Sequence, residues 1–139
     1  KGKNVITNYF GRVEKFDWYN TGDVVNVDEE GYLFILGRLK RFAKIAGEMI
    51  SLSQIEEFPK KLWPENTSVV CSIKDEEKGE ALILLTDNEH ADLSELKIFM
   101  QNTGLTNLNL PKKLKVISEF PILGSGKLDF KKLQEIANT

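Results

Sequence analysis

The sequence predicts an α+β fold in which helices pack on a small three-stranded sheet, preceded by a β-rich segment that belongs to another domain. Two apolar runs, "SVVCSIK" and "EALILLT", flank the polar stretch "DEEKG", which is typical of a β-hairpin. A further apolar run, "KLKVISEF", supplies the remaining strand. Helical patterns with capping residues separate these runs, and 139 residues suffice for one ordinary domain or a small domain with part of another.

The first part of the chain is expected to be β-rich. "VVNV" and "YLFIL" flank "DEEG", in which Asp28 and Gly31 suit a tight type I turn, so a hairpin is predicted that ends at Gly37. The basic run that follows, "RLKRFAKIAGEMI", has mixed periodicity and predicts short strands with a connector. We therefore expect residues 1–39 to end a larger domain and residues 40–139 to form the small one.

The first predicted helix begins at Ser53. Ser53 and Glu56 have the spacing of a capping box, in which each side chain bonds the backbone N–H group of the other residue. Pro59 is expected to kink or shorten this helix, because its ring removes a donor and clashes with the preceding turn. The residues expected along its buried face are Ile55, Phe58 and Leu62.

Two further helices are predicted. Asp92 and Glu95 cap the second, which ends near Gly104, and the third follows Lys127. Both are expected to pack on the three-stranded sheet. The residues expected to be buried are Leu93, Leu96, Phe99 and Met100 in the second helix, and Phe130, Leu133 and either Ile136 or Ala137 in the third.

Composition excludes several classes of protein. The chain is 41% hydrophobic and 29% charged with a net charge of −2, which argues against disorder and against a global attraction to nucleic acid. Cys71 lies in an apolar run and is expected in the core, and the lone His90 has no Cys or second His at ligand spacing, so no metal site is predicted. No apolar run approaches the roughly 20 residues of a membrane span, and no signal peptide is visible. A soluble, cytoplasmic piece of a longer polypeptide is therefore expected.

Two stretches have residues that suit a nucleotide. In "YNTGD", residues 19–23, the carboxylate of Asp23 after a Thr-Gly turn can accept hydrogen bonds from both hydroxyls of a ribose. In "GRLKRFAKIAG", residues 37–47, Arg38 offers a planar fork for ribose or phosphate oxygens, and Gly47 lets a ligand approach the backbone closely. Taken alone, the first stretch is more often a capped turn and the second a solvated basic face.

A third stretch, "PILGSGKLDF" at residues 121–130, places Lys127 on a pliable connection before a helix. It is not a phosphate-binding P-loop, because Pro121 and Leu128 stand where that motif needs a glycine and a serine or threonine. The alternative is a turn whose lysine only faces solvent.

In this order, the three stretches resemble the C-terminal signature of the adenylate-forming enzymes, the family of acyl-CoA synthetases, peptide-synthetase adenylation domains and firefly luciferase. That signature has a Y-x-T-G-D turn, a G-R-x-(D/K) hinge followed by K-I-x-G, and a final P-x-x-x-x-G-K, which match Tyr19–Asp23, Gly37–Gly47 and Pro121–Lys127. The run "GRLKRFAKIAGEMISL" is most similar to the acyl-acyl carrier protein synthetase part of bifunctional 2-acylglycerophosphoethanolamine acyltransferases. Arg41 and Glu48 differ from many other relatives, which favours this carrier-protein branch.

The resemblance implies an AMP-forming ligase that uses ATP and Mg²⁺, both bound mainly by a large N-terminal adenylation domain. A fatty acid would form an acyl-adenylate, and the phosphopantetheine thiol of acyl carrier protein, or of CoA, would then form a thioester. The fragment alone is expected to be inactive. The residues implied are catalytic Lys127, nucleotide-binding Asp23, Arg38, Tyr19 and Thr21, the hinge Lys40, and Gly47 with Ala46 at the pantetheine tunnel.

Several alternatives stay open on the sequence. CoA can replace carrier protein as the acceptor, and the chain can be a non-catalytic docking module, although such a module has no need of Asp23, Arg38 and Lys127 together. The basic residues Lys112, Lys113 and Lys115 can meet an acidic carrier protein or form a strand edge that discourages aggregation. A role in phospholipid metabolism at the cytoplasmic face of the inner membrane follows only where the parent also carries the acyltransferase.

Overall fold

The computed structural model describes residue 18 and residues 20–139 of the chain. The chain divides into two units, residues 1–39 and residues 40–139. Tyr19, one of the predicted nucleotide contacts, lies outside the described residues. Within the described part, none of the helices combines the length and the apolarity that a bilayer span requires.

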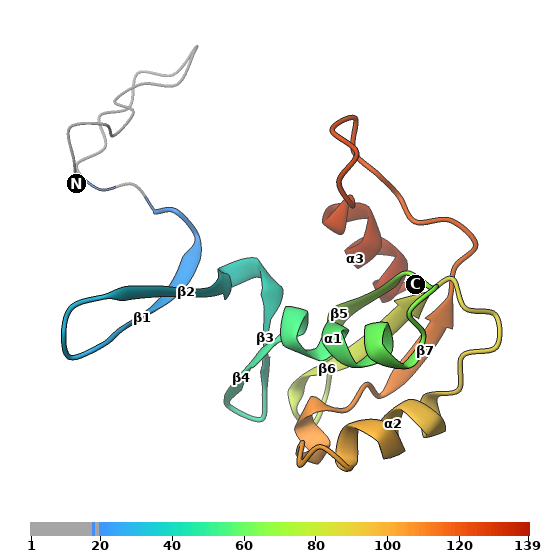
Figure 1. The fold of residues 1–139 in the computed structure, drawn as a ribbon. Coiled ribbons are helices and arrows are strands. Elements are labelled where there is room, and N and C mark those ends of the chain that lie inside the picture. Colours follow the sequence, from blue (N-terminus) through green and yellow to red (C-terminus); the bar gives the residue numbers. More distant parts are fainter. Residues whose placement is uncertain (1–17, 19) are drawn as a thin grey trace. The chain divides into compact units, whose positions relative to one another are not determined.

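The first unit contains a β-hairpin (Figure 1). β1 (Asp23–Val27) pairs antiparallel with β2 (Leu33–Arg38). Asp28 closes the turn between them, because its Oδ1 accepts hydrogen bonds from the backbone N–H groups of Glu30 and Tyr32 at 3.1 and 2.8 Å. The predicted hairpin is confirmed, and its second strand extends one residue beyond the predicted end.

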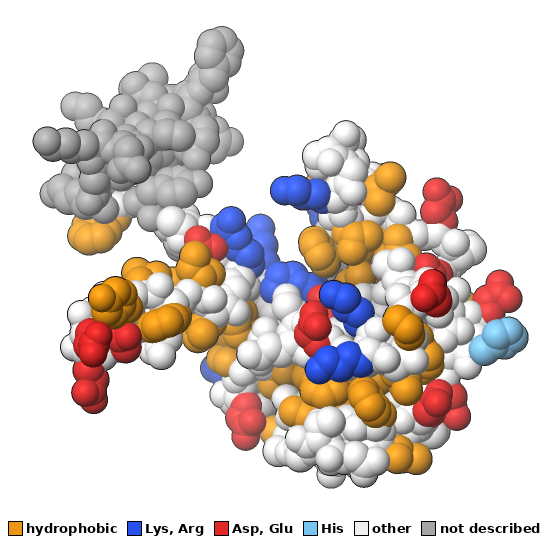
Figure 2. All heavy atoms as spheres, viewed as in Figure 1, with side chains coloured by type: hydrophobic (Ala, Val, Ile, Leu, Met, Phe, Trp, Pro, Cys, Tyr) orange, Lys and Arg blue, Asp and Glu red, His pale blue; other side chains and the backbone are white. Residues whose placement is uncertain are grey.

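This hairpin carries apolar side chains on both of its faces. Phe34, Ile35 and Leu36 are 53%, 70% and 53% exposed, and successive strand residues point to opposite faces. In Figure 2, apolar side chains cover the hairpin and acidic side chains gather at its turn. A lone hairpin is marginally stable in water, and an exposed apolar surface of this kind is typical of strands that pack against further protein.

Residues 40–139, all of which the structure describes, contain a three-stranded sheet, a separate hairpin and three helices. The sheet has the order β5–β6–β7, with β5 antiparallel and β7 parallel to β6, and the separate hairpin is formed by β3 and β4. The strands are β3 (Phe42–Ile45), β4 (Glu48–Ser51), β5 (Ser68–Asp75), β6 (Gly79–Thr86) and β7 (Lys113–Val116). The helices are α1 (Leu52–Leu62), α2 (Leu93–Gln101) and α3 (Phe130–Asn138), with short 3-10 turns at Leu39–Arg41 and Asn107–Asn109.

Two apolar clusters lie on opposite faces of the three-stranded sheet. Side chains alternate along β5 and β6, so one face carries Val70 and Leu84 and the other carries Val69 and Leu85, all at most 2% exposed. α1 and α2 cover the first face, and α3 covers the second (Figure 1). The predicted α+β fold, with helices packed on a three-stranded sheet, is therefore confirmed.

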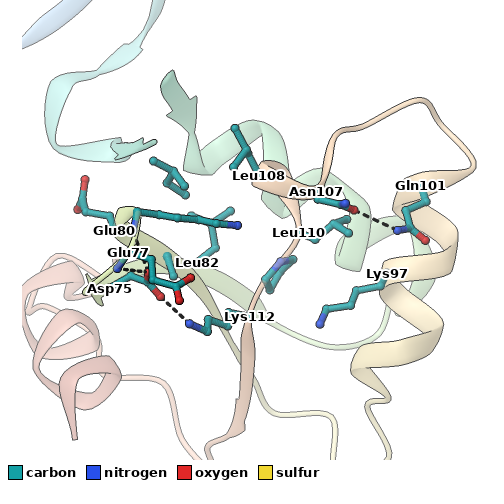
Figure 3. A pocket seen from close by; sticks show the side chains of 14 residues that line it. Asp75, Glu77, Glu80, Leu82, Lys97, Gln101, Asn107, Leu108, Leu110 and Lys112 are labelled. Carbon is teal, nitrogen blue, oxygen red and sulfur yellow. Dashed lines mark hydrogen bonds and ion pairs between the residues drawn. The ribbon is translucent and has the colours of Figure 1, made fainter. Parts of the chain in front are cut away.

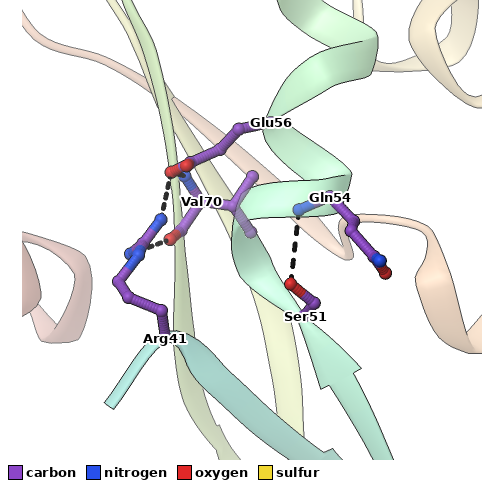
Figure 4. Close-up of polar contacts among 5 residues, drawn as sticks. All are labelled: Arg41, Ser51, Gln54, Glu56 and Val70. Atoms are coloured by element: carbon purple, nitrogen blue, oxygen red, sulfur yellow. Dashed lines mark hydrogen bonds and ion pairs between the residues drawn. The ribbon is translucent and has the colours of Figure 1, made fainter. Parts of the chain in front are cut away.

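The start of α1 differs from the prediction. Its N-cap is Ser51, whose Oγ accepts a hydrogen bond from the N–H group of Gln54 at 3.4 Å (Figure 4). The predicted capping box of Ser53 and Glu56 is wrong, because the helix starts directly after β4 and the Glu56 side chain bonds elsewhere. The helix also continues beyond Pro59, so the prolyl ring does not end it.

Two expectations for the last part of the chain are also corrected. β7 ends at Val116, four residues short of the predicted end. Phe130 is 44% exposed rather than buried, because it lies outside both apolar clusters. Its ring contacts the guanidinium of Arg41 instead, with 4.4 Å between Cζ and the ring centroid. Leu133 and Ala137 are buried on α3 as predicted.

Candidate functional site

Asp23 and Arg38 face each other at the ends of β1 and β2. They occupy paired positions of the strand ladder, and Arg38 Nε lies 3.0 Å from Asp23 Oδ1. Arg38 Nη1 also donates a hydrogen bond to the backbone oxygen of Thr21 at 2.9 Å. The Arg38 side chain is 67% exposed and that of Asp23 is 22% exposed. As far as the described residues go, the Arg38 guanidinium thus keeps N–H donors without a partner, beside a carboxylate that is fixed on one side.

A short turn positions Asp23. The side-chain oxygen of Asn20 accepts a hydrogen bond from the N–H group of Gly22 at 2.9 Å, and the hydroxyl oxygen of Thr21 accepts one from the N–H group of Asp23 at 3.2 Å. Gly22 has a φ of 73°, which glycine adopts without strain. Thr21 therefore contacts Asp23 through its hydroxyl and Arg38 through its carbonyl.

Lys127 lies on a loop that is closed by backbone hydrogen bonds. The N–H group of Leu123 donates to the oxygen of Lys127 at 2.7 Å, and the N–H group of Gly126 donates to the oxygen of Leu123 at 2.8 Å. A bridge between Ile122 and Leu128 continues this pairing. The loop is thus held by its own backbone, rather than being the simple pliable connection that was predicted. The Lys127 side chain is exposed and forms no ion pair with any described residue.

Ala46 and Gly47 form the two-residue turn between β3 and β4. Both have a positive φ, 50° and 91°, as in the type I′ turns of short hairpins, and both are exposed. Lys40 is also exposed and lies in the 3-10 turn at which the second unit begins. Among the described residues, no backbone hydrogen bond joins the Ala46–Gly47 turn to the Lys127 loop, so each loop has its own support.

Arg41, the residue after the predicted hinge, is anchored within the second unit (Figure 4). Its guanidinium forms an ion pair with Glu56 Oε1 and donates a hydrogen bond to the backbone oxygen of Val70 at 3.1 Å. Glu56 Oε1 also accepts a hydrogen bond from the N–H group of Val70 at 2.8 Å. The side chains of Arg41 and Glu56 are only 14% and 20% exposed. No local spacing links these three residues, so the sequence indicated only that Arg41 differs from relatives.

Two of the three lysines near β7, Lys112 and Lys115, have partners within the second unit. Lys112 Nζ lies 2.6 Å from Asp75 Oδ2, and Lys115 Nζ donates a hydrogen bond to the backbone oxygen of Ile136 at 2.9 Å. The hydrogen bond from the Lys112 ammonium, followed by that from the backbone N–H group of Lys78, lowers the pKa of Asp75, and Asp75 raises the pKa of Lys112. The third lysine, Lys113, is exposed and its side chain bonds no described residue, so only this cation of the three is without a partner in the described part of the chain.

A cavity of about 450 Å³ lies next to the Asp75–Lys112 pair (Figure 3). Its walls come from β6, the end of α2 and the segment before β7, and it reaches Ile45, the residue before the Ala46–Gly47 turn. Its charged lining residues are Asp75, Glu77, Lys78, Glu80, Lys97 and Lys112. Because acidic and basic groups are mixed, the lining does not select one class of ligand.

Cys71 is a core residue, as predicted. It is 2% exposed and packs in the cluster that contains Leu133. Burial raises the pKa of its thiol to about 11, so the reactive thiolate is scarce at neutral pH. Across the part of the chain that the structure describes, no three His, Cys, Asp or Glu side chains are grouped to hold a metal ion.

Curated proteins that are similar to the chain are named as ligases. No family model matches it. The human mitochondrial medium-chain acyl-CoA ligase is 30% identical over 145 residues, which cover 97% of this chain and 23% of that protein. The 2,3-dihydroxybenzoate-AMP ligase of Bacillus subtilis is 28% identical over 120 residues, which cover 85% of this chain and 22% of that protein. The chain thus spans about a quarter of the length of the curated relatives it matches.

Solved structures share the fold. The fatty acyl-CoA synthetase of Mycobacterium tuberculosis has a TM-score of 0.65 and 29% identity, over 86% of this chain and 24% of that chain. ATP-bound MatB from Rhodopseudomonas palustris has a TM-score of 0.69 at 24% identity, over 84% of this chain and 24% of that chain. The second likeness shows the fold alone.

Proposed function

We propose that this chain serves both half-reactions of an adenylate-forming ligase. Its relatives and structural neighbours indicate a C-terminal domain of the adenylate-forming acyl-CoA and aryl-CoA ligases. The first half-reaction joins the carboxylate of the acid to the α-phosphate of ATP and releases pyrophosphate. In the second, a phosphopantetheine thiol takes the acyl group and AMP leaves. In this proposal residues 1–39 end the large adenylation domain, which holds most of the ATP and its Mg²⁺, and residues 40–139 are its mobile partner.

We assign Asp23 and Arg38 to the ribose of ATP. Arg38 engages Oδ1 of Asp23, and no described residue bonds Oδ2, which would accept hydrogen bonds from ribose hydroxyls. The exposed Arg38 fork has further N–H donors for ribose or phosphate oxygens. Thr21 contacts both residues and fixes their geometry. Tyr19 is assigned to the nucleotide from the sequence motif alone.

The observation that carries the proposal is the exposure of Lys127 on a closed loop. Lys112 and Lys115 have partners within the second unit, whereas the Lys127 ammonium is exposed to solvent. Adenylation gathers carboxylate and phosphate oxygens around one phosphorus, so a cation placed there relieves their repulsion. A unit charge about 4 Å from a developing negative charge is worth about 4 kcal/mol at an effective dielectric constant of about 20.

We assign the Ala46–Gly47 turn to the tunnel of the pantetheine arm, and Lys40 to a hinge. Apart from its chain neighbours, a Cβ at Gly47 would meet no atom of the described residues within 4 Å, so a side chain there would extend into open space, where it would obstruct the arm. Between the two half-reactions, rotation of the backbone at Lys40 would withdraw the Lys127 loop from the active site and bring this turn there in its place. Because Arg41 is bonded to α1 and β5, such a rotation would carry the second unit as one body.

We assign acyl carrier protein as the acceptor and a fatty acid as the acyl substrate. The run "GRLKRFAKIAGEMISL" favours this assignment, and a bifunctional parent that also acylates lysophospholipids at the inner membrane goes with it. The names of the relatives favour CoA as the alternative acceptor. An assay of the full-length enzyme with both acceptors in competition separates these two choices, since exclusive transfer to CoA contradicts the carrier-protein assignment.

The catalytic role is tested by Lys127→Ala in the full-length enzyme. Acyl-adenylate formation, measured as pyrophosphate release, is expected to fall by roughly a hundred- to thousandfold. Thioester formation from supplied acyl-adenylate is expected to stay within about twofold of wild type. Lys131→Ala, which removes an exposed lysine of α3, is the matched control and is expected to change neither rate. Equal loss of both half-reactions contradicts the role of Lys127.

A further inference from the structure

The Ala46–Gly47 turn has a strained backbone. Among the described residues, Ala46 is the one residue other than glycine with a positive φ, and residues that carry a Cβ adopt such a conformation only at a cost. Strained conformations persist where the surrounding structure fixes them, and they cluster at ligand-binding sites. The β3–β4 ladder has only four residue pairs, so the hairpin alone supplies little of that support.

Two hydrogen bonds from the β5–β6 hairpin supply the support. The N–H group of Ala46 donates to the backbone oxygen of Lys78 at 2.9 Å, and the N–H group of Lys44 donates to Glu80 Oε2 at 2.6 Å. Lys78 therefore binds the strained residue itself, and Glu80 binds β3 two residues before it. The second bond joins residues that are 36 positions apart, so it is a tertiary contact.

The β5–β6 turn is itself held in place. Asp75 Oδ1 accepts hydrogen bonds from the N–H groups of Glu77 at 3.1 Å and Lys78 at 3.0 Å, and Asp75 Oδ2 pairs with Lys112 at 2.6 Å. Figure 3 shows these contacts, with Glu80 next to them in the same cavity wall. The carbonyl of Lys78 is thus presented to Ala46 by a turn that is fixed on both sides.

We propose that Glu80 is a positioning residue for acyl transfer to the pantetheine thiol. Its carboxylate, together with the Lys78 carbonyl, holds the Ala46–Gly47 turn in the conformation that lines the tunnel. The inference rests on the proposed function, because the turn faces the pantetheine arm only if the chain forms thioesters. Loss of Glu80 misplaces the turn and leaves the Lys127 loop unchanged, so the second half-reaction fails while adenylation continues.

The test compares Glu80→Ala, Glu80→Gln and Glu76→Ala in the full-length enzyme. Glu80→Ala is expected to lower kcat/KM for the thiol acceptor about tenfold, the effect of one lost hydrogen bond to a charged acceptor, and to leave pyrophosphate release within about twofold. Glu80→Gln keeps an oxygen acceptor and is expected to restore the rate to within about threefold of wild type. Glu76 lies in the same turn, is exposed and bonds no described residue through its side chain, so Glu76→Ala is the matched control. Equal loss of both half-reactions, or no rescue by glutamine, overturns the inference.

The contact itself is tested without any activity. In amide hydrogen exchange of the 139-residue chain, Glu80→Ala is expected to raise the exchange rate of the Lys44 N–H group about tenfold, while that of Val70 in β5 is unchanged and shows that the variant folds. An unchanged rate at Lys44 overturns the inference. The two proposals fail separately: normal adenylation in Lys127→Ala removes the proposed function, whereas normal thioester formation in Glu80→Ala removes only the positioning role.

Discussion

Glu56→Ala is expected to destabilise the second unit strongly, because one oxygen of Glu56 serves two buried groups. Oε1 accepts hydrogen bonds from Arg41 and from the N–H group of Val70, a residue with no exposed surface. Leaving a buried N–H group without an acceptor costs about 1–3 kcal/mol. Arg41 keeps its hydrogen bond to the Val70 oxygen and its contact with Phe130 in the variant. Loss of its ion pair with Glu56 is therefore expected to lower the free energy of unfolding by about 1–2 kcal/mol, less than the roughly 3–5 kcal/mol for breaking a fully buried pair.

The expected decrease in the free energy of unfolding is therefore about 3 kcal/mol, which lowers the Tm of a unit of this size by roughly 12–24 °C. Urea unfolding of the chain, followed by far-UV circular dichroism, measures the decrease. Glu57→Ala is the matched control, since its side chain is 57% exposed and lies 3.9 Å from Lys60, a contact worth at most about 0.5 kcal/mol. Glu56→Gln keeps a neutral acceptor and is expected to fall between the two. If Glu56→Ala lowers the free energy of unfolding no more than Glu57→Ala does, the contact between Arg41 and Glu56 does not stabilise the second unit.

Three further predictions concern pH, thiol reactivity and the hinge. Asp75→Asn is expected to lower the free energy of unfolding at neutral pH, because the folded-state pKa of Asp75 is lowered from 3.8. The difference in this free energy between wild type and variant is expected above about pH 4 and shrinks as pH falls through the folded pKa. A difference that persists in strong acid contradicts the prediction. Cys71, with its pKa raised to about 11, is expected to react with thiol reagents near pH 8 only at the rate of unfolding, and rapid labelling of the native chain would show that the site is open. Lys40→Pro in the full-length enzyme is expected to slow thioester formation more than adenylation, because proline fixes φ at the hinge, and unchanged rates in both assays argue against a hinge there.

The features that the sequence predicted correctly depend on residues close together in the chain. The β1–β2 hairpin follows from Asp28 and the apolar runs on either side of its turn, and the β5–β6 hairpin follows from two apolar runs around one polar turn. The start of α1 was placed wrongly because Ser51 and Ser53 are both good N-caps. The end of β4, which depends on pairing with β3, decides between them.

The candidate site likewise combines local contacts, which the sequence predicts, with a distant contact that it does not predict. The contact between Asp23 and Arg38 follows from the strand pairing of a predictable hairpin, and the exposure of Lys127 follows from a local loop. The bond between Lys44 and Glu80 joins residues 36 positions apart, and no periodic pattern or cap signals it. Such contacts form only when two hairpins pack together, and a single sequence carries no record of that packing.

The separate supports of the two loops have a functional consequence within the proposed mechanism. The Lys127 loop closes on its own backbone and leads into α3, whereas the Ala46–Gly47 turn depends on the β5–β6 turn and Glu80. Sites that share no contacts respond independently to substitution. One small domain can therefore be altered in one half-reaction without loss of the other, provided that each loop keeps its shape when the domain moves. The contacts of Arg41 next to the proposed hinge would meet that condition, because they would direct a rotation into the backbone at Lys40 rather than into the packing of the domain.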